Sequence, residues 1–230
     1  MSHDTTRWIG VADSDALSEV AYRRVLDCAE CAIKQRSQFL IVLAGGNTPL
    51  RVYRMLRDAD TDWSRWHVYF GDERCLPAEH AERNSTMAGD VWLNHVPIPQ
   101  KQVHLIRAEL GPDAAALAYA ETLRGVDDFD LVLLGLGEDG HTASLFPNYD
   151  CGSAPGSADV VTVFDAPKPP AQRVSLSAAR LSRTRAALFM VAGTSKRSAV
   201  RRWRSGEPLP AAAIRPAGGV DILVESALLD

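Results

Sequence analysis

The sequence predicts an α/β fold, with a doubly wound, mostly parallel sheet and helices on both of its faces. Three observations support this prediction. Strand candidates alternate with helix candidates along the chain, and several strands, such as Phe39–Leu43, are continuous apolar runs of the kind that parallel sheets bury on both faces. Several strands also end in a turn rich in glycine and charge, and such turns gather along one edge of a parallel sheet, where ligands bind.

Composition indicates one domain over residues 1–230. The chain is 46% hydrophobic and 23% charged, which is enough for a sizeable core. Lys and Arg number 25 against 29 Asp and Glu, for a formal net charge of -4, so no global positive field attracts nucleic acid or an anionic membrane. An anionic ligand must therefore be bound by a local site.

The sequence shows no targeting or membrane segment. No apolar run approaches the roughly 20 residues of a membrane-spanning helix, and Met1–Asp4 lacks the basic and then apolar pattern of a signal peptide. We therefore expect a cytoplasmic protein without membrane partners. The aromatic content of 7% and the lack of an obvious exposed apolar stripe permit a monomer, which is the expected state.

Up to residue 123, four expected strands alternate with four expected helices. Asp13 or Ser14 can cap the first helix, which apolar residues at helical spacing extend to about Arg36. Asn47 or Thr48 can cap the second helix, whose first turn also contains Pro49 and which runs to Leu56. The expected strands are Arg7–Val11, Phe39–Leu43, Trp66–Phe70 and Val103–Ile106, and the later helices are Asn84–Leu93 and Asp113–Leu123.

After residue 129 the same alternation continues without internal repeats. Leu131–Leu134 is a buried strand, and Gly193–Lys196 is a turn that opens a helix through Trp203. The Gly, Ser and Pro content of Tyr149–Ser157 indicates an exposed loop. The remaining expected strands are Val160–Phe164, Arg173–Leu176, Ala186–Val191 and Val220–Val224, and a proline-rich loop, Asp165–Pro170, separates the first two.

Two turns have the physical makings of an anion site. One precedes a helix and offers backbone N–H groups, a hydroxyl and the positive end of the helix dipole; it contains Gly45, Gly46, Asn47 and Thr48. The other ends in Lys196 at a second helix start. Arg74 and Arg173 come from other loops and can each grip an anion with two hydrogen bonds. Each residue alone is also explained as a cap or a surface charge, so their joint occurrence at strand ends favours the anion site.

A glycine-rich turn after Leu131–Leu134 contains the candidate catalytic pair. Asp139 and His141 are separated by one glycine. An imidazole with an ordinary pKa near 6.5 suits proton transfer near neutrality, and a carboxylate can orient it. A lone histidine is more often structural, but a position after a glycine turn at a sheet edge, with a carboxylate within reach, favours catalysis.

Four other kinds of site are disfavoured. Gly135–Gly140 spells the dinucleotide pattern G-x-G-x-x-G, but Glu138 and Asp139 would repel pyrophosphate. Cys28 and Cys31 form C-x-x-C inside a helical pattern with no second pair, which argues against a redox or zinc site. The sequence contains neither the G-x-S-x-G elbow of serine hydrolases nor the H-E-x-x-H zinc motif. We expect no metal and no cofactor.

Five blocks resemble the signature blocks of the 6-phosphogluconolactonase family, in that family's order and over nearly the whole chain. They are Ala44–Pro49, Gly71–Arg74 with Pro77 and Asn84, Gly135–Pro147, Asp165–Pro170 with Arg173, and Gly193 with Lys196. That family resembles glucosamine-6-phosphate deaminase in fold, within a broader group that has a Rossmann-like sheet.

The resemblance implies hydrolysis of 6-phosphoglucono-1,5-lactone to 6-phosphogluconate in the oxidative pentose phosphate pathway, without a metal. It implies that His141 takes a proton from water and that Asp139 holds the imidazole. Asp72 and Glu73 are expected to orient Arg74 or bind sugar hydroxyls, and Lys168 is either a further cation or a solvated loop residue. The expected ligands of the phosphate and the developing oxyanion are Gly45, Gly46, Asn47, Thr48, Arg74, Arg173 and Lys196.

Two alternative functions remain open. In the deaminase family the block continues after the histidine as Ile-Ala-Phe-Asn-Glu-Pro, and the glutamate serves the ring-opening histidine; here Phe146 stands in its position. A non-catalytic sugar-phosphate sensor is the second alternative, disfavoured because the chain before Arg7 is too short for a DNA-binding domain and the histidine is kept. Ala44 and Arg83 stand where serine is frequent in the lactonases, which leaves room for altered phosphate affinity.

Overall fold

The computed structural model describes residues 6–230, in which a parallel sheet of seven strands forms the centre. The expectation drawn from Met1–Asp4 lies outside the described residues. Every neighbouring pair in the sheet is parallel, in the order β1-β10-β9-β6-β2-β3-β5. The strands are β1 (Thr6–Val11), β2 (Phe39–Leu43), β3 (Trp66–Phe70), β5 (Val103–His104), β6 (Leu131–Gly135), β9 (Ala187–Val191) and β10 (Val220–Glu225).

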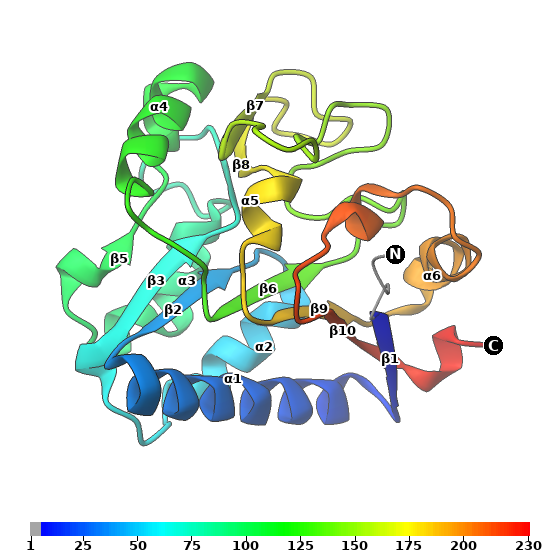
Figure 1. Ribbon diagram of the computed structural model, residues 1–230, viewed down its shortest axis with the longest axis horizontal. Helices are drawn as coiled ribbons and strands as arrows, with labels where there is room; N and C mark the ends of the chain where they lie inside the picture. The colour runs from blue at the N-terminus through cyan, green and yellow to red at the C-terminus, as the bar shows by residue number, and fades with distance from the viewer. Residues whose placement is uncertain (1–5) are drawn as a thin grey trace.

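Helices cover both faces of this sheet, which confirms the expected fold class. In Figure 1, α1 and α2 lie below the sheet, and α5 and α6 lie above it. The helices are α1 (Ser14–Arg36), α2 (Asn47–Leu56), α3 (Asn84–Val91), α4 (Pro112–Thr122), α5 (Ala178–Ser182) and α6 (Arg197–Arg204). Single 3-10 turns occupy Trp63–Arg65, Leu93–His95, Gln100–Gln102, Ala108–Leu110, Thr194–Lys196, Pro210–Ala213 and Ser226–Leu228. Helix α5, with five residues, was not predicted, because it is too short to show a helical pattern.

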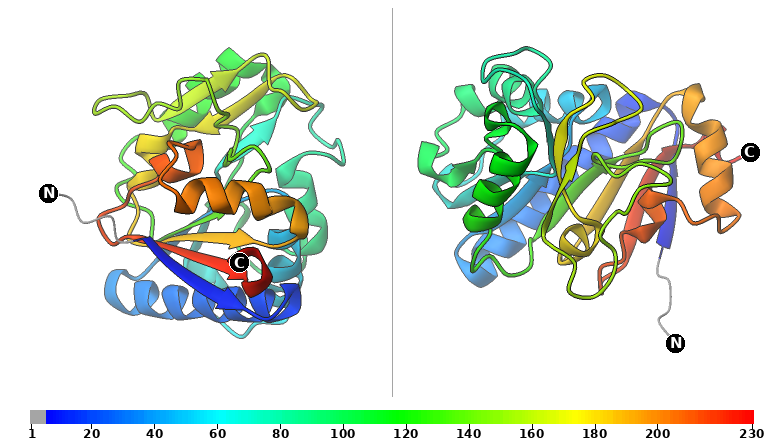
Figure 2. Two further views of the ribbon diagram at one scale, coloured as in Figure 1. Left: turned by 90° about the vertical axis from the view of Figure 1, so that its right-hand side faces the viewer. Right: turned by 90° about the horizontal axis from the view of Figure 1, so that it is seen from above.

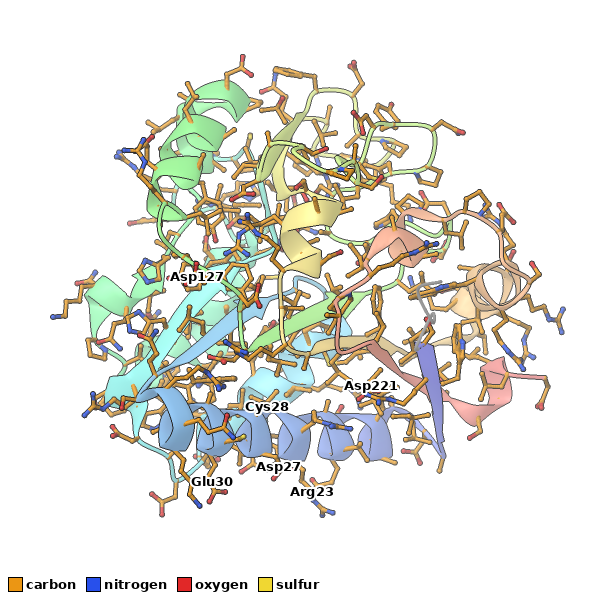
Figure 3. The ribbon with its side chains drawn as sticks, in the orientation of Figure 1. Arg23, Asp27, Cys28, Glu30, Asp127 and Asp221 are labelled. Carbon is orange, nitrogen blue, oxygen red and sulfur yellow. The ribbon has the colours of Figure 1, made fainter. Side chains whose placement is uncertain are left out.

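Helix α1 is amphipathic and begins at the predicted cap. The Asp13 carboxylate accepts hydrogen bonds from the first backbone N–H groups of α1, at 3.0 and 2.8 Å. Arg23, Asp27 and Glu30 point away from the sheet, whereas Cys28 points toward it (Figure 3). Cys28 and its neighbour in the C-x-x-C pattern are both free thiols, and burial raises the pKa of Cys28 to about 11. A protonated thiol of this kind is a poor redox nucleophile.

A second, antiparallel sheet lies above the first. It contains β4 (Asp72–Arg74), β8 (Arg173–Leu176) and β7 (Val160–Val163) in that order, and α4 packs against it (Figure 2). The prediction that Arg74 comes from a loop was therefore wrong. Asp72–Arg74 becomes a strand because it pairs with Arg173–Ser175, a partner about a hundred residues away that local pattern cannot reveal.

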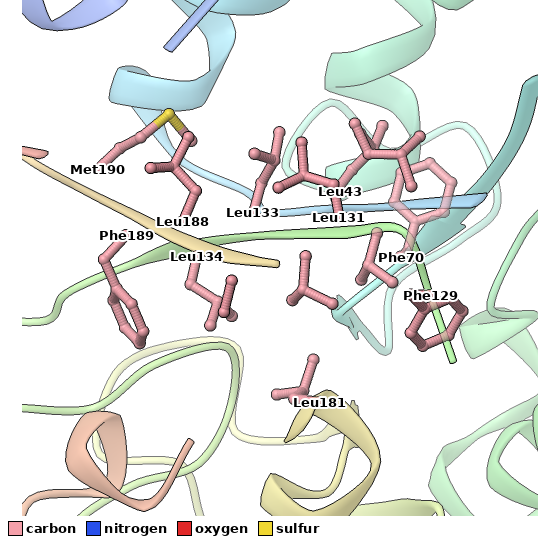
Figure 4. Packing of buried hydrophobic residues seen from close by; sticks show 14 of the residues in the cluster. Leu43, Phe70, Phe129, Leu131, Leu133, Leu134, Leu181, Leu188, Phe189 and Met190 are labelled. Atoms are coloured by element: carbon pink, nitrogen blue, oxygen red, sulfur yellow. The ribbon is translucent and has the colours of Figure 1, made fainter. Parts of the chain in front are cut away.

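The core surrounds β6 in the middle of the large sheet. Its residues Leu131–Leu134 are buried on both faces, as a continuous apolar run predicts. Figure 4 shows Leu133 with Leu188 on one face and Leu134 with Phe189 on the other. From β2 the chain moves outward to β3, and from β6 it moves outward to β9, so β2 and β6 flank the point where the strand order reverses. Ligands bind at such switch points in open α/β sheets.

Candidate active site

A cleft of about 450 Å³ opens at the carboxyl ends of the strands, between β2 and β6. The register between these strands ends at Val42 and Val132, and the next residues of both strands line the cleft. The predicted site residues on its wall are Gly45, Gly46, Asn47, Thr48, Asp72, Arg74, His141, Arg173 and Lys196. Only Asp139 of the predicted set lies outside the lining, and it is hydrogen-bonded to His141. The fold thus brings together residues from five separate segments.

The Asp139–His141 pair is held by two hydrogen bonds. One oxygen of Asp139 accepts from the backbone N–H of His141 at 3.1 Å and from its Nδ1 at 2.5 Å. A carboxylate only accepts, so Nδ1 carries the ring hydrogen and Nε2 carries the lone pair. Nε2 makes no hydrogen bond to the part of the chain that the structure describes. The side chain of His141 is 20% exposed, so this nitrogen is open to a small molecule in the cleft.

Burial lowers the pKa of His141 below its ordinary value, although Asp139 and, at longer range, Asp72 raise it. The imidazole is therefore neutral near pH 7 and able to accept a proton. Burial also acts on Asp139 by raising its pKa, but the hydrogen bonds and charge of His141 outweigh that effect and hold it below its ordinary value. The carboxylate therefore stays ionised beside the ring.

The glycines of this turn place the imidazole ring. A Cβ on Gly137 would lie 2.1 Å from Nδ1 of His141, so only glycine leaves room for the ring. The N–H of Gly137 donates to the carbonyl of His141 at 2.7 Å and closes the turn. Gly140 has a φ of +92°, a region that disfavours side chains. These glycines therefore make room for the imidazole ring and close the turn that holds it.

Phe146 forms an apolar wall between the histidine and an arginine. Its ring centroid lies 4.8 Å from that of His141, and the guanidinium of Arg173 lies 5.6 Å from it. Phe146 is 1% exposed. The position that carries the glutamate in the deaminase block thus offers no carboxylate to His141.

Two arginines lie opposite each other on neighbouring strands of the small sheet. Arg74 and Arg173 are direct partners in the register of β4 with β8. Like charges in this position are destabilising unless an anion lies between them. Arg173 is 6% exposed and donates to the carbonyls of the proline-rich loop at 3.0 to 3.2 Å. Arg74 donates to the carbonyl of Glu82, and its buried Nε has no partner among residues 6–230. Both arginines line the cleft, so this pair can bind an anion there.

The Asp72 carboxylate links the small sheet to the segment that follows His141. One of its carboxylate oxygens accepts from Asn84 Nδ2 at 2.9 Å, and the other accepts from Ser144 Oγ at 2.6 Å. Each oxygen retains a lone pair for a substrate hydroxyl. Neither Asn84 nor Ser144 was singled out as a site residue from the sequence, because both act through contacts between distant segments.

Glu73 does not serve the cleft. It is fully buried and accepts hydrogen bonds from the first backbone N–H groups of α3, on Asn84 and Ser85, at 2.7 and 2.9 Å. Its role is therefore to cap α3, and not to hold a sugar hydroxyl or the guanidinium of Arg74. Arg83, one of the two departures from the common lactonase pattern, lies 3.5 Å from the Glu73 carboxylate and donates to Glu109 at 2.9 Å. It balances buried charge away from the cleft.

The start of α2 leaves backbone N–H groups free for an anion. Helix α2 begins at Asn47, its cap is Gly46 with a φ of 99°, and no side chain caps it. The prediction that Asn47 or Thr48 caps this helix was therefore wrong. Gly45 lies against Asn84, whose Oδ1 would be 2.0 Å from an added Cβ. The uncapped first turn lines the cleft and offers the donors and dipole that bind anions.

Two lysines line the cleft together with Arg74 and Arg173, and these four cations form its positive wall. Burial lowers the pKa of Lys196, Glu138 raises it and Lys168 lowers it. Lys168 also lowers the pKa of His141. Lys168 is exposed but lines the cleft with Lys196. Among residues 6–230, the lining thus has four cations and one carboxylate, that of Asp72.

Within residues 6–230, no group of three or more His, Cys, Asp or Glu side chains is arranged to hold a metal ion. No helix in the same range is long and apolar enough to cross a membrane.

Comparison with known proteins identifies the family. Residues 12–223 match the family model for glucosamine-6-phosphate isomerases/6-phosphogluconolactonase. A 6-phosphogluconolactonase of Mycobacterium leprae is 38% identical over 233 residues, which cover 95% of this chain and 93% of that protein. A human 6-phosphogluconolactonase is 34% identical over 218 residues, covering 89% of this chain and 83% of that protein.

A solved structure shares the whole architecture. The crystal structure of 6-phosphogluconolactonase from Thermotoga maritima superposes with a TM-score of 0.88 at 27% identity, covering 96% of this chain and 100% of that chain. Taken with the match over residues 12–223, this likeness shows that the chain belongs to the glucosamine-6-phosphate isomerase/6-phosphogluconolactonase family.

Proposed function

We propose that this protein is a 6-phosphogluconolactonase that hydrolyses 6-phosphoglucono-1,5-lactone to 6-phosphogluconate, a step of the oxidative pentose phosphate pathway. The observation that carries the proposal is a neutral His141, oriented by Asp139 through Nδ1, on the wall of a cleft lined by four cations. A base beside an anion site fits a phosphorylated substrate that reacts with water. The lactonase relatives named above support the same substrate.

The reaction needs only a positioned base and charge stabilisation, because a lactone is an activated ester. Nε2 of His141 takes a proton from a water molecule as its oxygen attacks the lactone carbonyl. The carbonyl electrons move onto oxygen, and Asp139 stabilises the imidazolium that forms. When the ring C–O bond breaks, the imidazolium returns the proton to the leaving ring oxygen. The products are the freed hydroxyl and a carboxylic acid, which releases its remaining proton to solvent and becomes the carboxylate, and no metal takes part.

The phosphate is assigned to the positive wall. The first turn of α2, Arg173 and Lys196 hold it, while Arg74 serves either the phosphate or the developing oxyanion. Lys168 supplies a further cation, since it lies close enough to Lys196 and His141 to lower both of their pKa values. The Asp72 carboxylate accepts a sugar hydroxyl with its remaining lone pairs.

The deaminase alternative lacks a specific supporting observation. Ring opening of an amino sugar in that family relies on a glutamate next to the histidine, and Phe146 occupies this position. An apolar ring in contact with the imidazole cannot take or give a proton.

The proposal is tested with freshly generated 6-phosphoglucono-1,5-lactone, with the uncatalysed hydrolysis subtracted and glucosamine 6-phosphate assayed in parallel. We expect lactone turnover well above background that persists in EDTA, and no ammonia release from the amino sugar. Deamination without lactone hydrolysis would assign the chain to the other branch of the family. Binding of 6-phosphogluconate without turnover of either substrate would identify a sensor.

A further inference from the structure

Two buried tyrosine hydroxyls each bond both backbone groups of a single residue at the end of a strand. The hydroxyl of Tyr53 donates to the carbonyl of Ala44 at 2.8 Å and accepts from its N–H at 3.0 Å. The hydroxyl of Tyr119 does the same at Phe70, at 3.0 and 2.9 Å. Tyr53 is 2% exposed and Tyr119 is 1% exposed. Burial raises the pKa of both phenols, so each keeps the proton that it donates.

Ala44 needs such a partner because β6 no longer pairs with β2 at this position. In a strand, the N–H and C=O of one residue point to the same neighbouring strand, and those of the next residue point to the other. The carbonyl of Leu43 accepts from Gly71, on the β3 side. The groups of Ala44 therefore face β6, whose pairing with β2 ends at Val42. Tyr53 occupies the bonding position that β6 gives up where the cleft opens.

Phe70 has the same need on the other side of β3. Gly71 bonds toward β2, so the groups of Phe70 face β5. Strand β5 pairs only with Val68 and Tyr69 and then ends. Tyr119, on α4, takes the place of the missing strand. Unpaired buried backbone groups are costly, and each hydroxyl satisfies two of them.

These two residues stand directly before the loops of the proposed phosphate site. Ala44 precedes Gly45 and the first turn of α2, and Phe70 precedes Gly71 and the strand with Arg74. Tyr53 belongs to α2 itself, so its bonds tie that helix to the end of β2 across nine residues. Neither tyrosine lines the cleft. They can influence a ligand only through the backbone that they hold.

We propose that Tyr53 and Tyr119 are positioning residues whose hydroxyls fix the carboxyl ends of β2 and β3, so that the strands separate at the cleft while the phosphate-binding loops keep their geometry. This inference rests on the proposed function for its kinetic readout. It adds two residues from outside the cleft to those that determine substrate affinity. Their role is distinct from the chemistry of His141, so their loss weakens binding more than turnover.

The kinetic test compares Tyr53→Phe and Tyr119→Phe with Tyr69→Phe as the matched control. Tyr69 lies on β3 and is 3% exposed, and its hydroxyl bonds nothing among the residues that the structure describes. We expect the KM for the lactone to rise about 10-fold in the first two variants, with kcat within about twofold of wild type, because phosphate contacts act alike in the ground and transition states. The control keeps both constants. A KM equal to the control's in both variants, with only the melting temperature lowered, would show a purely structural role and overturn the proposal.

A second measurement on the wild-type protein does not depend on the variants folding. Amide hydrogen exchange without ligand should show the N–H groups of Ala44 and Phe70 protected to the level of the interior of β2. If these two amides exchange as fast as exposed loop amides, the tyrosine hydroxyls do not hold them, and the inference is refuted. Failure of the wild type to turn over lactone would instead refute the proposed function, and the exchange result would then decide the inference alone.

Discussion

The Asp139–His141 pair shows how one turn tunes the pKa of the imidazole that we propose as the base. Burial lowers the pKa of the imidazole, and the single carboxylate on Nδ1 partly restores it while fixing the tautomer. The carboxylate is itself kept ionised by the same contact. A base whose pKa is lowered in this way is neutral over most of the physiological range, at some cost in basicity.

This balance predicts the pH dependence of the enzyme. The acid limb of background-corrected kcat/KM should lie below pH 6.5, since His141 must lose its proton to act. Asp139→Asn removes the interaction that raises this pKa, so the limb should move to lower pH, and kcat should fall on the order of 10²-fold because the tautomer is no longer fixed. Rate profiles between pH 5 and 8 measure both effects. A limb that moves to higher pH would contradict the electrostatic account.

Arg173 makes a different prediction, about affinity. It is buried, held by three carbonyls and opposed to Arg74, so it is preorganised for an anion. Arg173→Ala should raise KM roughly 10–100-fold, the worth of a hydrogen bond to a charged group, with a smaller change in kcat. Arg183→Ala is the control, since Arg183 is 49% exposed and pairs with Asp159. An unchanged KM in Arg173→Ala would remove it from the phosphate site.

At the scale of elements, the turn after β6 is shaped around the imidazole. Gly137→Ala places a methyl group 2.1 Å from the present position of Nδ1, so the ring must move and lose its bond to Asp139. We expect kcat to fall at least about 10-fold, with a loss of about 1–3 kcal/mol in the free energy of unfolding, because Gly137 is buried and the added methyl group overpacks the turn. Steady-state kinetics and chemical denaturation measure the two quantities. Wild-type kcat in this variant would show that the ring position is not critical.

The edge of the large sheet makes a prediction about stability. His104 on β5 stacks on Tyr69 with centroids 4.3 Å apart, and burial, aided by His67, lowers the pKa of His104 to about 4. The unfolded chain binds this proton near pH 6.5 and the folded chain only near pH 4, so stability is lost as pH falls through that window. His104→Phe keeps the stack and should flatten the loss. Urea unfolding at pH 7 and pH 5 tests this, and an unchanged difference between the two would count against the assignment.

The elements that local pattern could predict are those whose cause is local. Strands β2 and β3 begin and end at the predicted residues, because a parallel strand buried on both faces is a continuous apolar run. The cap of α1 was predicted because it is a single side chain beside the helix. Strand β4 was not, since its hydrogen bonds come from β8 far along the chain. The cap of α2 was assigned to a side chain, whereas the helix begins uncapped after a glycine.

At the scale of the whole molecule, the cleft lies where the two sheets meet. The large sheet contributes the loops after β2, β6 and β9, and the small sheet contributes the opposed arginines. Asp72 links the two through Asn84 and Ser144. The net charge of -4 leaves the protein without a general affinity for anions, and the cations on the cleft wall supply it locally.

The candidate site was largely foreseeable because its members follow strand ends, which a parallel sheet gathers at one edge. All of the predicted site residues except Asp139 line one cleft at that edge. Residues that act between segments gave no local signal. Ser144, Tyr53 and Tyr119 are ordinary core or loop residues by pattern, and only the fold reveals which carboxylate or backbone group each of them holds.

The most direct test of the account is the rate of lactone hydrolysis by His141→Ala, with the uncatalysed reaction subtracted. We predict a loss of 10²–10⁴-fold in kcat, the usual contribution of general acid–base catalysis, with the melting temperature and the affinity for 6-phosphogluconate close to wild type. A variant that hydrolyses the lactone at the wild-type rate above background would contradict the assignment of His141 as the base.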